Sequence, residues 1–229
     1  MTMAISGLGA RILGKSNEIH DMIEVRHREV LGQPPRLPPL DRRSVADQVQ
    51  ATTQRLRGGV VSDQPSMPLD AIPEIMFTMC RFPDLWHKLI DLTIEIQGAN
   101  ARLDLRDRKL AILRTGWLCR APYEFGEHVN QARRAGFTDE EIERITAGSS
   151  APEWDEHERA ILRAAEELHA DAMVGDETWA QLSKRLDEHQ LVELLVLVGQ
   201  FVATAYFQNS LRLRLEAGNH GLALHRAGS

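Results

Sequence analysis

The feature that most constrains this chain is a succession of helix-start signals with no strand pattern between them. Short alternating runs rich in Val, Ile, Thr and aromatic residues, which are typical of strands, are absent from the sequence. In a capping box, an N-cap side chain and the side chain three residues later each accept the other's backbone N–H. Three such pairs are present: Thr138 with Glu141, Asp155 with Glu158, and Asp187 with Gln190. The pattern predicts an all-α fold.

Apolar periodicity and helix breakers divide the chain into ten expected helices. The residue before a proline is pushed out of the helical region, so residues 33–40, with four prolines, are expected to be extended. A second loop, 58–68, is interpreted as a linker, with a lid as the alternative. The expected helices are 16–31, 41–57, 70–79, 83–98, 104–119, 122–134, 138–146, 155–171, 176–185 and 188–216.

These breaks predict three parts. Residues 1–33 form a helical arm that has apolar positions but no core of its own, so we expect it to wrap a neighbouring copy. Residues 34–217 form the main domain, and residues 218–229 form a tail that contains glycine and is expected to be mobile. The apolar positions of the arm are Ile12, Ile19, Ile23 and Val30.

The last expected helix is apolar on nearly every face. A helix of this kind is buried, either in the core of its own subunit or against another subunit. We therefore expect it to contribute to a subunit interface. Its apolar positions include Leu191, Leu194, Leu195, Leu197, Val198, Phe201, Val202, Ala205, Tyr206 and Leu213.

Composition narrows the function classes. The hydrophobic fraction of 43% and the charged fraction of 26% are ordinary for a soluble globular protein. A net charge of -6 disfavours general binding to nucleic acid. No uninterrupted apolar run approaches the roughly 20 residues that span a bilayer, and the N-terminus lacks a signal-peptide pattern. We therefore expect a cytoplasmic protein that binds neither nucleic acid nor a membrane.

Residues 117–128 bring the most chemistry together. The proline in this stretch suits the first turn of a helix, which predicts a helix over residues 122–134. Tyr123 and Glu124 then lie in the first turn, and His128 lies one turn above Glu124 on nearly the same face. A helix N-terminus with an acid, a base and a phenol is suited to proton transfer.

Each of these three side chains has a catalytic and a structural interpretation. His128 titrates near neutral pH and is the main candidate for moving a proton, and the alternative is a structural histidine bonded to Glu124 or to a carbonyl. Glu124 either orients His128, acts as the base itself, or is simply a helix-start acid. Tyr123 either donates to an oxyanion or packs in the core.

Four further residues are candidates for binding the substrate. Arg114, like Arg108, is suited to clamping a carboxylate, with a surface salt bridge as the alternative. Trp117 is a pocket wall or a core residue. Cys119 is a small buried hydrophobe or a pocket thiol that assists proton transfer. Glu127 points about 100° away from the histidine, which also suits a solvated or intersubunit acid.

No motif predicts a metal or a cofactor. Glu-x-x-His, a spacing found in di-iron bundles, occurs at Glu24/His27 and at Glu166/His169. With nine histidines in a glutamate-rich chain, about one such match is expected by chance, so metal-dependent oxidation is a minor alternative. Cys80 and Cys119 form no metal or redox spacing. A glycine-rich phosphate loop and a Gly-x-Ser-x-Gly elbow are both absent from the sequence.

Taken together, several stretches resemble the carboxymuconolactone decarboxylase family, which is related to the alkylhydroperoxidase D group. The resemblance covers roughly residues 36–217 and implies an all-α, alkylhydroperoxidase D-like helical bundle. It also implies a homo-oligomer, as a trimer, dimer or hexamer, with pockets near subunit interfaces. The stretches are LDLRDRKLAILRTG at 103–116, YEFGEH at 123–128, AGFTDEEI at 135–142, WDEHERAIL at 154–162, and QLVEL at 190–194.

The peroxidase branch of this family resembles a glutamate followed by Cys-x-x-Cys-x-x-x-His. Here the histidine position is His128, but the two cysteine positions are Ala121 and Glu124, and the glutamate position is Lys109. Thiol peroxidases need an attacking thiolate and a resolving thiol, so disulfide cycling is not expected. Lys109 is interpreted as a partner of Glu124 or as part of an anion site. The decarboxylase branch also lacks the cysteine pair and is implied to use acid–base chemistry on a lactone acid.

The leading hypothesis is a cofactor-independent lyase (decarboxylase) or isomerase that acts on a small carboxylated, lactone or carbonyl substrate. His128, oriented by Glu124, moves a proton, while Tyr123 and the helix N-terminus stabilise the enolate. One alternative is a non-enzymatic binding or assembly protein that retains the fold. Another is a residual thiol peroxidase-like redox protein that uses Cys119. The expected partners are a small-molecule substrate and other copies of the chain.

Overall fold

The computed structural model describes residues 4–60 and 67–224, without the side chains of residues 4–16 and 58–60. Within these ranges the chain consists of helices and their connections, which confirms the predicted all-α class. Part of the expected linker at 58–68, the side chain of Ile12 and the last residues of the tail lie outside the description.

The helices follow the order expected from the sequence, with differences at several of their ends. The helix expected at 41–57 continues to Val60, the helix expected at 70–79 begins at Glu74, and the helix expected at 176–185 ends at Leu182. The first helix begins at Ala4 instead of residue 16, and the second begins at Ala46 instead of residue 41. The last helix ends at Leu211 because Arg212 adopts a left-handed conformation, with φ of 57°. The elements are α1 Ala4–Val30, α2 Ala46–Val60, η1 Leu69–Ala71, α3 Glu74–Met79, α4 Pro83–Gln97, α5 Leu105–Leu118, α6 Pro122–Arg134, α7 Asp139–Ala147, α8 Glu156–Asp171, α9 Asp176–Leu182 and α10 Glu188–Leu211.

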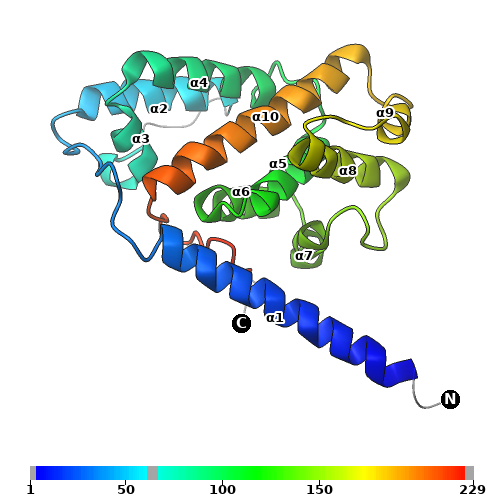
Figure 1. Ribbon diagram of the computed structural model, residues 1–229. Coiled ribbons are helices and arrows are strands. Elements are labelled where there is room, and N and C mark those ends of the chain that lie inside the picture. The colour runs from blue at the N-terminus through cyan, green and yellow to red at the C-terminus, as the bar shows by residue number, and fades with distance from the viewer. Residues whose placement is uncertain (1–3, 61–66, 225–229) are drawn as a thin grey trace.

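Helix α10 crosses the middle of the bundle and separates two groups of helices (Figure 1). The larger hydrophobic cluster joins α10 to α5, α6, α7 and α8, and its fully buried side chains include Leu113 and Ile161. The smaller cluster joins α2, α3 and α4, around Val49 and Phe77. Both α4 and α6 contribute to both clusters, since Tyr123 belongs to the smaller one and the nearby Phe125 to the larger one.

By length and composition, α10 would also be apolar enough to cross a membrane, with a mean hydropathy of 1.6. This differs from the expectation that no stretch of the chain has that character. One face of the helix is buried in the larger cluster, through residues such as Leu194 and Val198. The buried Glu193 carboxylate accepts the backbone N–H groups of Arg102 and Leu103, just before α5 begins. These contacts show that α10 is a central packing element of the bundle.

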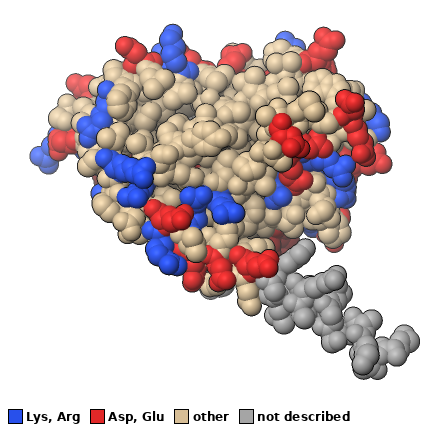
Figure 2. All heavy atoms as spheres, viewed as in Figure 1, with Lys and Arg blue, Asp and Glu red and all other residues tan. Residues whose placement is uncertain are grey.

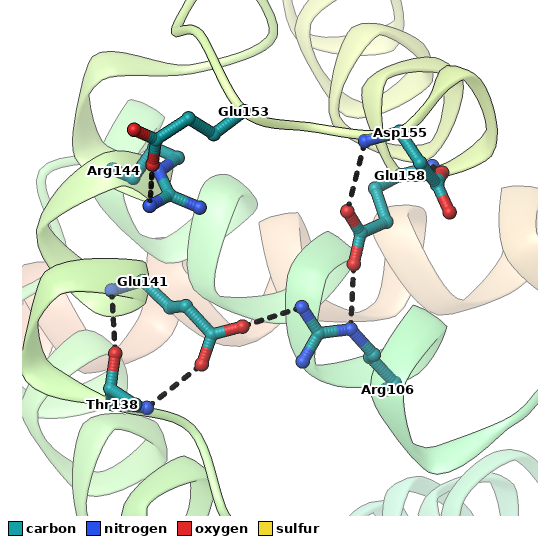
Figure 3. A network of polar contacts seen from close by, with 7 residues as sticks. All are labelled: Arg106, Thr138, Glu141, Arg144, Glu153, Asp155 and Glu158. Carbon is teal, nitrogen blue, oxygen red and sulfur yellow. Dashed lines mark hydrogen bonds and ion pairs between the residues drawn. The ribbon is translucent and has the colours of Figure 1, made fainter.

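All three predicted capping boxes are present in the structure. Arg106 of α5 joins two of them, because its guanidinium contacts Glu141 at 2.6 Å and Glu158 at 2.7 Å (Figure 3). The starts of α7 and α8 are therefore both tied to the first turn of α5. In the same region, Arg144 pairs with Glu153 (Figure 3).

The segment after α10 folds back onto the bundle. Asn219 Nδ2 donates to the backbone oxygen of Tyr123 at 3.0 Å, and the backbone N–H of Leu222 donates to His27 Nε2 at 3.0 Å. Leu222 is fully buried. A Cβ atom at Gly126 would overlap the Asn219 side chain, so the glycine permits this close approach. Residues 218–224, expected to be mobile, are instead packed between α1 and α6.

Candidate active site

A short connection between α5 and α6 brings the side chains of the candidate site together. Helix α5 ends at Leu118, and Arg120 then adopts a positive φ of 48° that turns the chain sharply. The extended Ala121 leads into Pro122 at the start of α6, as the proline predicted. A short connection makes consecutive helices neighbours. As a result, a side chain from the middle of α5 can meet the inner face of α6.

Three ionisable side chains form a continuous chain on this inner face. His128 Nε2 lies 3.1 Å from Glu124 Oε1, as the i,i+4 spacing predicted. His128 Nδ1 lies 3.4 Å from Lys109 Nζ of α5, and Lys109 Nζ also donates to Gln131 Oε1 at 2.7 Å. Only 3% of Glu124, 7% of His128 and 6% of Lys109 is exposed, so these groups interact with little screening by water.

Burial and neighbouring charges set the protonation states of His128 and Lys109. Burial lowers the pKa of His128, and the neighbouring Lys109 lowers it further, so the neutral imidazole is favoured. A neutral imidazole then donates from Nε2 to the Glu124 carboxylate and accepts from the Lys109 ammonium at Nδ1. Burial also lowers the pKa of Lys109 to about 8; Arg108 adds to this effect, while Glu124 and Glu127 oppose it. Lys109 therefore exchanges its proton near neutral pH.

Aromatic side chains enclose the polar groups. Phe201 of α10 stands edge-on to His128, with ring centroids 5.0 Å apart and an interplanar angle of 84°. The hydroxyl of Tyr123 donates to Glu216 Oε1 at 3.3 Å, and the same oxygen accepts the backbone N–H of Glu74 at the start of α3. Burial and the nearby carboxylates, Glu216 first, raise the pKa of Tyr123 far above its usual value, so the phenol stays protonated.

Glu124, His128 and Lys109 lie at the wall of a cavity of about 810 Å³ between the two hydrophobic clusters. Tyr123, Glu124, Glu127 and His128 line it from α6, and Lys109 lines it from α5. The opposite wall is mainly apolar and comes from α2, α3, α4 and α10. Side chains on that wall include Leu56, Ile75, Met76, Trp86, Leu89 and Phe207.

The charged lining of the cavity is more positive than negative. Four cationic residues face two carboxylates, Glu124 and Glu127. A cavity with this balance favours an anionic ligand, and its apolar wall favours a ligand with a hydrophobic part. The cationic residues are Arg57, Arg108, Lys109 and Arg134.

Three predicted substrate-binding residues do not line this cavity. Arg114 instead bonds Glu166 at 2.9 Å and the backbone oxygens of Ile145 and Thr146. Trp117 packs against Phe125 in the larger cluster. Cys119 lies 3.9 Å from His169, and burial, with a smaller contribution from Glu124, raises its pKa to about 11. The structure therefore brings together Tyr123, Glu124, Glu127 and His128 of the predicted set.

Sequence reasoning gave too little weight to several residues of the site. The spacing from His128 to Gln131 is one helical turn and could have revealed that Gln131 shares the inner face of α6. Lys109 was noted through the family resemblance, but its contact with His128 depends on the packing of two helices. No local pattern points to Phe201 or Glu216, because both come from distant parts of the chain.

The described residues contain no cluster of three or more His, Cys, Asp or Glu side chains arranged to hold a metal. At one of the Glu-x-x-His spacings, Glu166 accepts hydrogen bonds from Arg114 and Ser149. At the other, Glu24 pairs with His20 on α1 at 3.2 Å, while His27 accepts the Leu222 N–H.

The fold is similar to that of alkylhydroperoxidase D-like proteins. The debrominase Bmp8, as a cysteine-to-alanine variant with 2,3,4-tribromopyrrole, has 17% identity, a TM-score of 0.66, and coverage of 82% of this chain and 95% of that chain. An alkylhydroperoxidase AhpD core from Ralstonia eutropha, an uncharacterised peroxidase-related protein, has 13% identity, a TM-score of 0.66, and coverage of 80% and 94%. A putative antioxidant defence protein AhpD from Agrobacterium tumefaciens has 18% identity, a TM-score of 0.56, and coverage of 60% and 94%.

At these identities the structural similarity establishes the fold class. In sequence, residues 83–167 match the model of the carboxymuconolactone decarboxylase family. The family resemblance predicted from the motifs is confirmed over this segment, and the fold agrees with that of alkylhydroperoxidase D-like proteins. No curated protein matches it in sequence. The matched segment includes α5 and α6, and therefore Lys109, Glu124 and His128.

Proposed function

We propose that the protein is a cofactor-independent acid–base enzyme, a decarboxylase or isomerase of a small substrate with a carboxylate and a carbonyl or lactone group. The observation that carries the proposal is the buried chain from Glu124 through His128 to Lys109 beside a cavity of about 810 Å³. Burial moves the pKa of Lys109 to about 8, and buried ionisable groups with perturbed pKa values beside a cavity are typical of catalytic sites.

In this mechanism His128 works as a relay. Its Nδ1 accepts a proton from Lys109 while its Nε2 gives one to Glu124, so the imidazole stays neutral overall. Before this transfer the Glu124 carboxylate can remove a proton next to the carbonyl, while the Lys109 ammonium stabilises the resulting enolate. After the transfer Glu124 is a carboxylic acid and can return a proton to the enolate. In a decarboxylation, loss of carbon dioxide leaves the same enolate, which the relay then protonates.

The remaining site residues have supporting roles. The positive end of α6 lies at Tyr123 and Glu124 and favours negative charge in the substrate. Tyr123 would reach an oxyanion only by exchanging its present partner, Glu216. The excess of cations attracts a carboxylate. Arg114, Trp117 and Cys119, which lie outside the cavity, have no part in this mechanism.

The alternative functions differ in what the cavity must contain. A pure binding or assembly protein predicts a sealed, apolar cavity, whereas this cavity is lined by six ionic side chains of both signs as well as by His128. A thiol peroxidase needs two neighbouring cysteines. The described cysteines, Cys80 and Cys119, are both free, and the high pKa of Cys119 leaves little thiolate at neutral pH. The arrangement therefore supports the acid–base enzyme best.

Two isosteric or truncating variants test the proposal. Small oxo acids and lactone acids are screened for release of carbon dioxide and for exchange of carbon-bound hydrogen in D₂O by NMR. On the active compound, Glu124→Gln and His128→Ala are expected to lower kcat/KM by about 10²–10⁴-fold. Glu188→Gln and His20→Ala change exposed residues outside the cavity and should behave as wild type. Full turnover by both site variants would show that the relay is not catalytic.

We also propose that the protein self-associates through α10. Its outward face presents Val192, Val196, Gly199, Ala203 and Tyr206 at alternating spacings of four and three residues, as in a helix–helix seam. Tyr206 is 67% exposed and Val192 56% exposed. Figure 2 shows a broad area without described charged side chains across the middle of the face where α10 runs in Figure 1. A second copy of α10 would cover this apolar face.

A further inference from the structure

We propose that Lys109 is a nucleophile that forms an imine with the keto group of a 3-oxo acid bound in the cavity. The inference rests on the proposed function, because it adds a covalent step to decarboxylation in the same cavity. It also narrows the substrate class from carboxylated carbonyl compounds in general to 3-oxo carboxylates with an apolar substituent.

The position of the amine suits this role. The chain has four lysines, Lys15, Lys88, Lys109 and Lys184, and among the described side chains Lys109 is the one that lines the cavity. An ammonium has three N–H groups. Gln131 and His128 take two of those of Lys109 within the described part of the chain, so the third is available to a ligand.

The surroundings of Lys109 also favour loss of the ammonium proton, which would otherwise prevent the amine from attacking a carbonyl carbon. At a pKa of about 8, roughly a quarter of Lys109 is the free amine at pH 7.5, compared with about one in a thousand for an ordinary lysine. The cause is burial reinforced by the charge of Arg108, a combination that activates lysine for imine formation. His128 Nδ1 is placed to accept the proton and passes one from Nε2 to Glu124.

The other walls of the cavity select the rest of the substrate. The buried Arg108 Nε has no hydrogen-bond partner among the described residues, while Arg108 Nη1 donates to the backbone oxygen of Gln97 at 2.7 Å. Arg108 lines the same cavity as Lys109 and can therefore bind the carboxylate while the ketone faces the amine. The apolar wall opposite, with Met76 and Trp86, accommodates the substituent on the ketone.

The chemical steps balance without a cofactor. The Lys109 amine adds to the ketone carbon, and the relay supplies the proton with which the carbinolamine loses water to form the iminium. The bond to the carboxylate then breaks, its electron pair forms the enamine double bond, and carbon dioxide leaves. The enamine carbon then takes one proton, which enters from solvent through the relay because dehydration used the first, and water hydrolyses the iminium to the ketone and the Lys109 ammonium. In sum, the 3-oxo acid anion and one proton give a ketone and carbon dioxide, and Lys109 is restored.

Borohydride trapping tests the inference directly on the whole chain. The wild-type protein is incubated with acetoacetate or 3-oxooctanoate, with and without sodium borohydride, and the modified lysine is identified by mass spectrometry of peptides. We expect one borohydride-dependent adduct per chain, on Lys109. Lys88→Met changes an exposed lysine of α4 and should be labelled as wild type. Lys109→Arg keeps the charge and should lose labelling by at least tenfold.

The outcomes separate this inference from the proposed function. Labelling of Lys88 or Lys184 to the same extent as Lys109, or no adduct on Lys109 with either probe, overturns the imine. If Lys109→Arg then retains turnover that Glu124→Gln loses, the acid–base function stands without a covalent step. If Lys109 is labelled and Glu124→Gln and His128→Ala leave turnover intact, the imine stands and the proposed relay is wrong.

Discussion

Replacing Lys109 by methionine is expected to stabilise the protein at neutral pH, although it removes a residue of the candidate site. The pKa of Lys109 falls from its ordinary 10.5 to about 8 on folding. At about 1.4 kcal/mol per pKa unit, holding the ammonium in the folded state costs about 3 kcal/mol at pH 7. Methionine removes this cost and fills similar volume. It also gives up two hydrogen bonds, worth about 2 kcal/mol together, so the net gain is about 1 kcal/mol.

The pH dependence is the sharper test. A group with a lowered pKa contributes stability that is present above its unfolded pKa and is lost as the pH falls through its folded pKa. For Lys109 the window runs from 10.5 down to about 8. Between pH 7 and pH 10, wild type should therefore gain about 2 kcal/mol relative to Lys109→Met. The lost hydrogen bonds and the altered packing change the free energy of unfolding of Lys109→Met by the same amount at both pH values. They therefore cancel when the two stability differences are compared.

Urea unfolding followed by circular dichroism at pH 7 and pH 10 measures this change. Lys88→Met is the matched control, because it removes an exposed lysine and should keep the same stability difference from wild type at both pH values. A difference between wild type and Lys109→Met that stays constant within about 0.5 kcal/mol would refute the burial of a charged lysine beside His128.

Three further predictions concern the tail, the arm and α10. Gly126→Ala should detach the segment around Asn219 and lower the free energy of unfolding by about 1–3 kcal/mol in the same urea assay, because the added Cβ overlaps that side chain. Burial lowers the pKa of His27, and its Nε2 accepts the Leu222 N–H, so this contact holds above pH 6.5 and is lost as the pH falls through the lowered pKa. The amide protection factor of Leu222 should therefore drop on acidification in wild type but not in His27→Ala. Val196→Glu should reduce the molar mass measured by light scattering, and an unchanged mass, or flotation of the wild type with liposomes, would contradict self-association through α10.

The local elements of this structure were predictable because they depend on residues close together in the chain. Each capping box joins residues three apart, and Pro122 at the start of α6 acts through its own ring. The same holds for the Glu124–His128 contact, which needs one helical turn and nothing else. The family resemblance placed these pieces in the right fold, and the composition of α10 marked it as an element that needs partners.

The rest of the site required the tertiary structure, because its contacts join residues that are far apart in the chain. Lys109 of α5 contacts His128 of α6, and Tyr123 of α6 contacts Glu216, which follows α10 and is 93 residues further along the chain. Arg114 and Lys109 are both cations of α5, but their side chains diverge, one to Glu166 and the other to the cavity. The sequence by itself determined the helices and the acid–base pair at the start of α6. Packing decided which neighbouring charges that pair would meet, because the burial and separation of charges depend on how the helices are arranged in space.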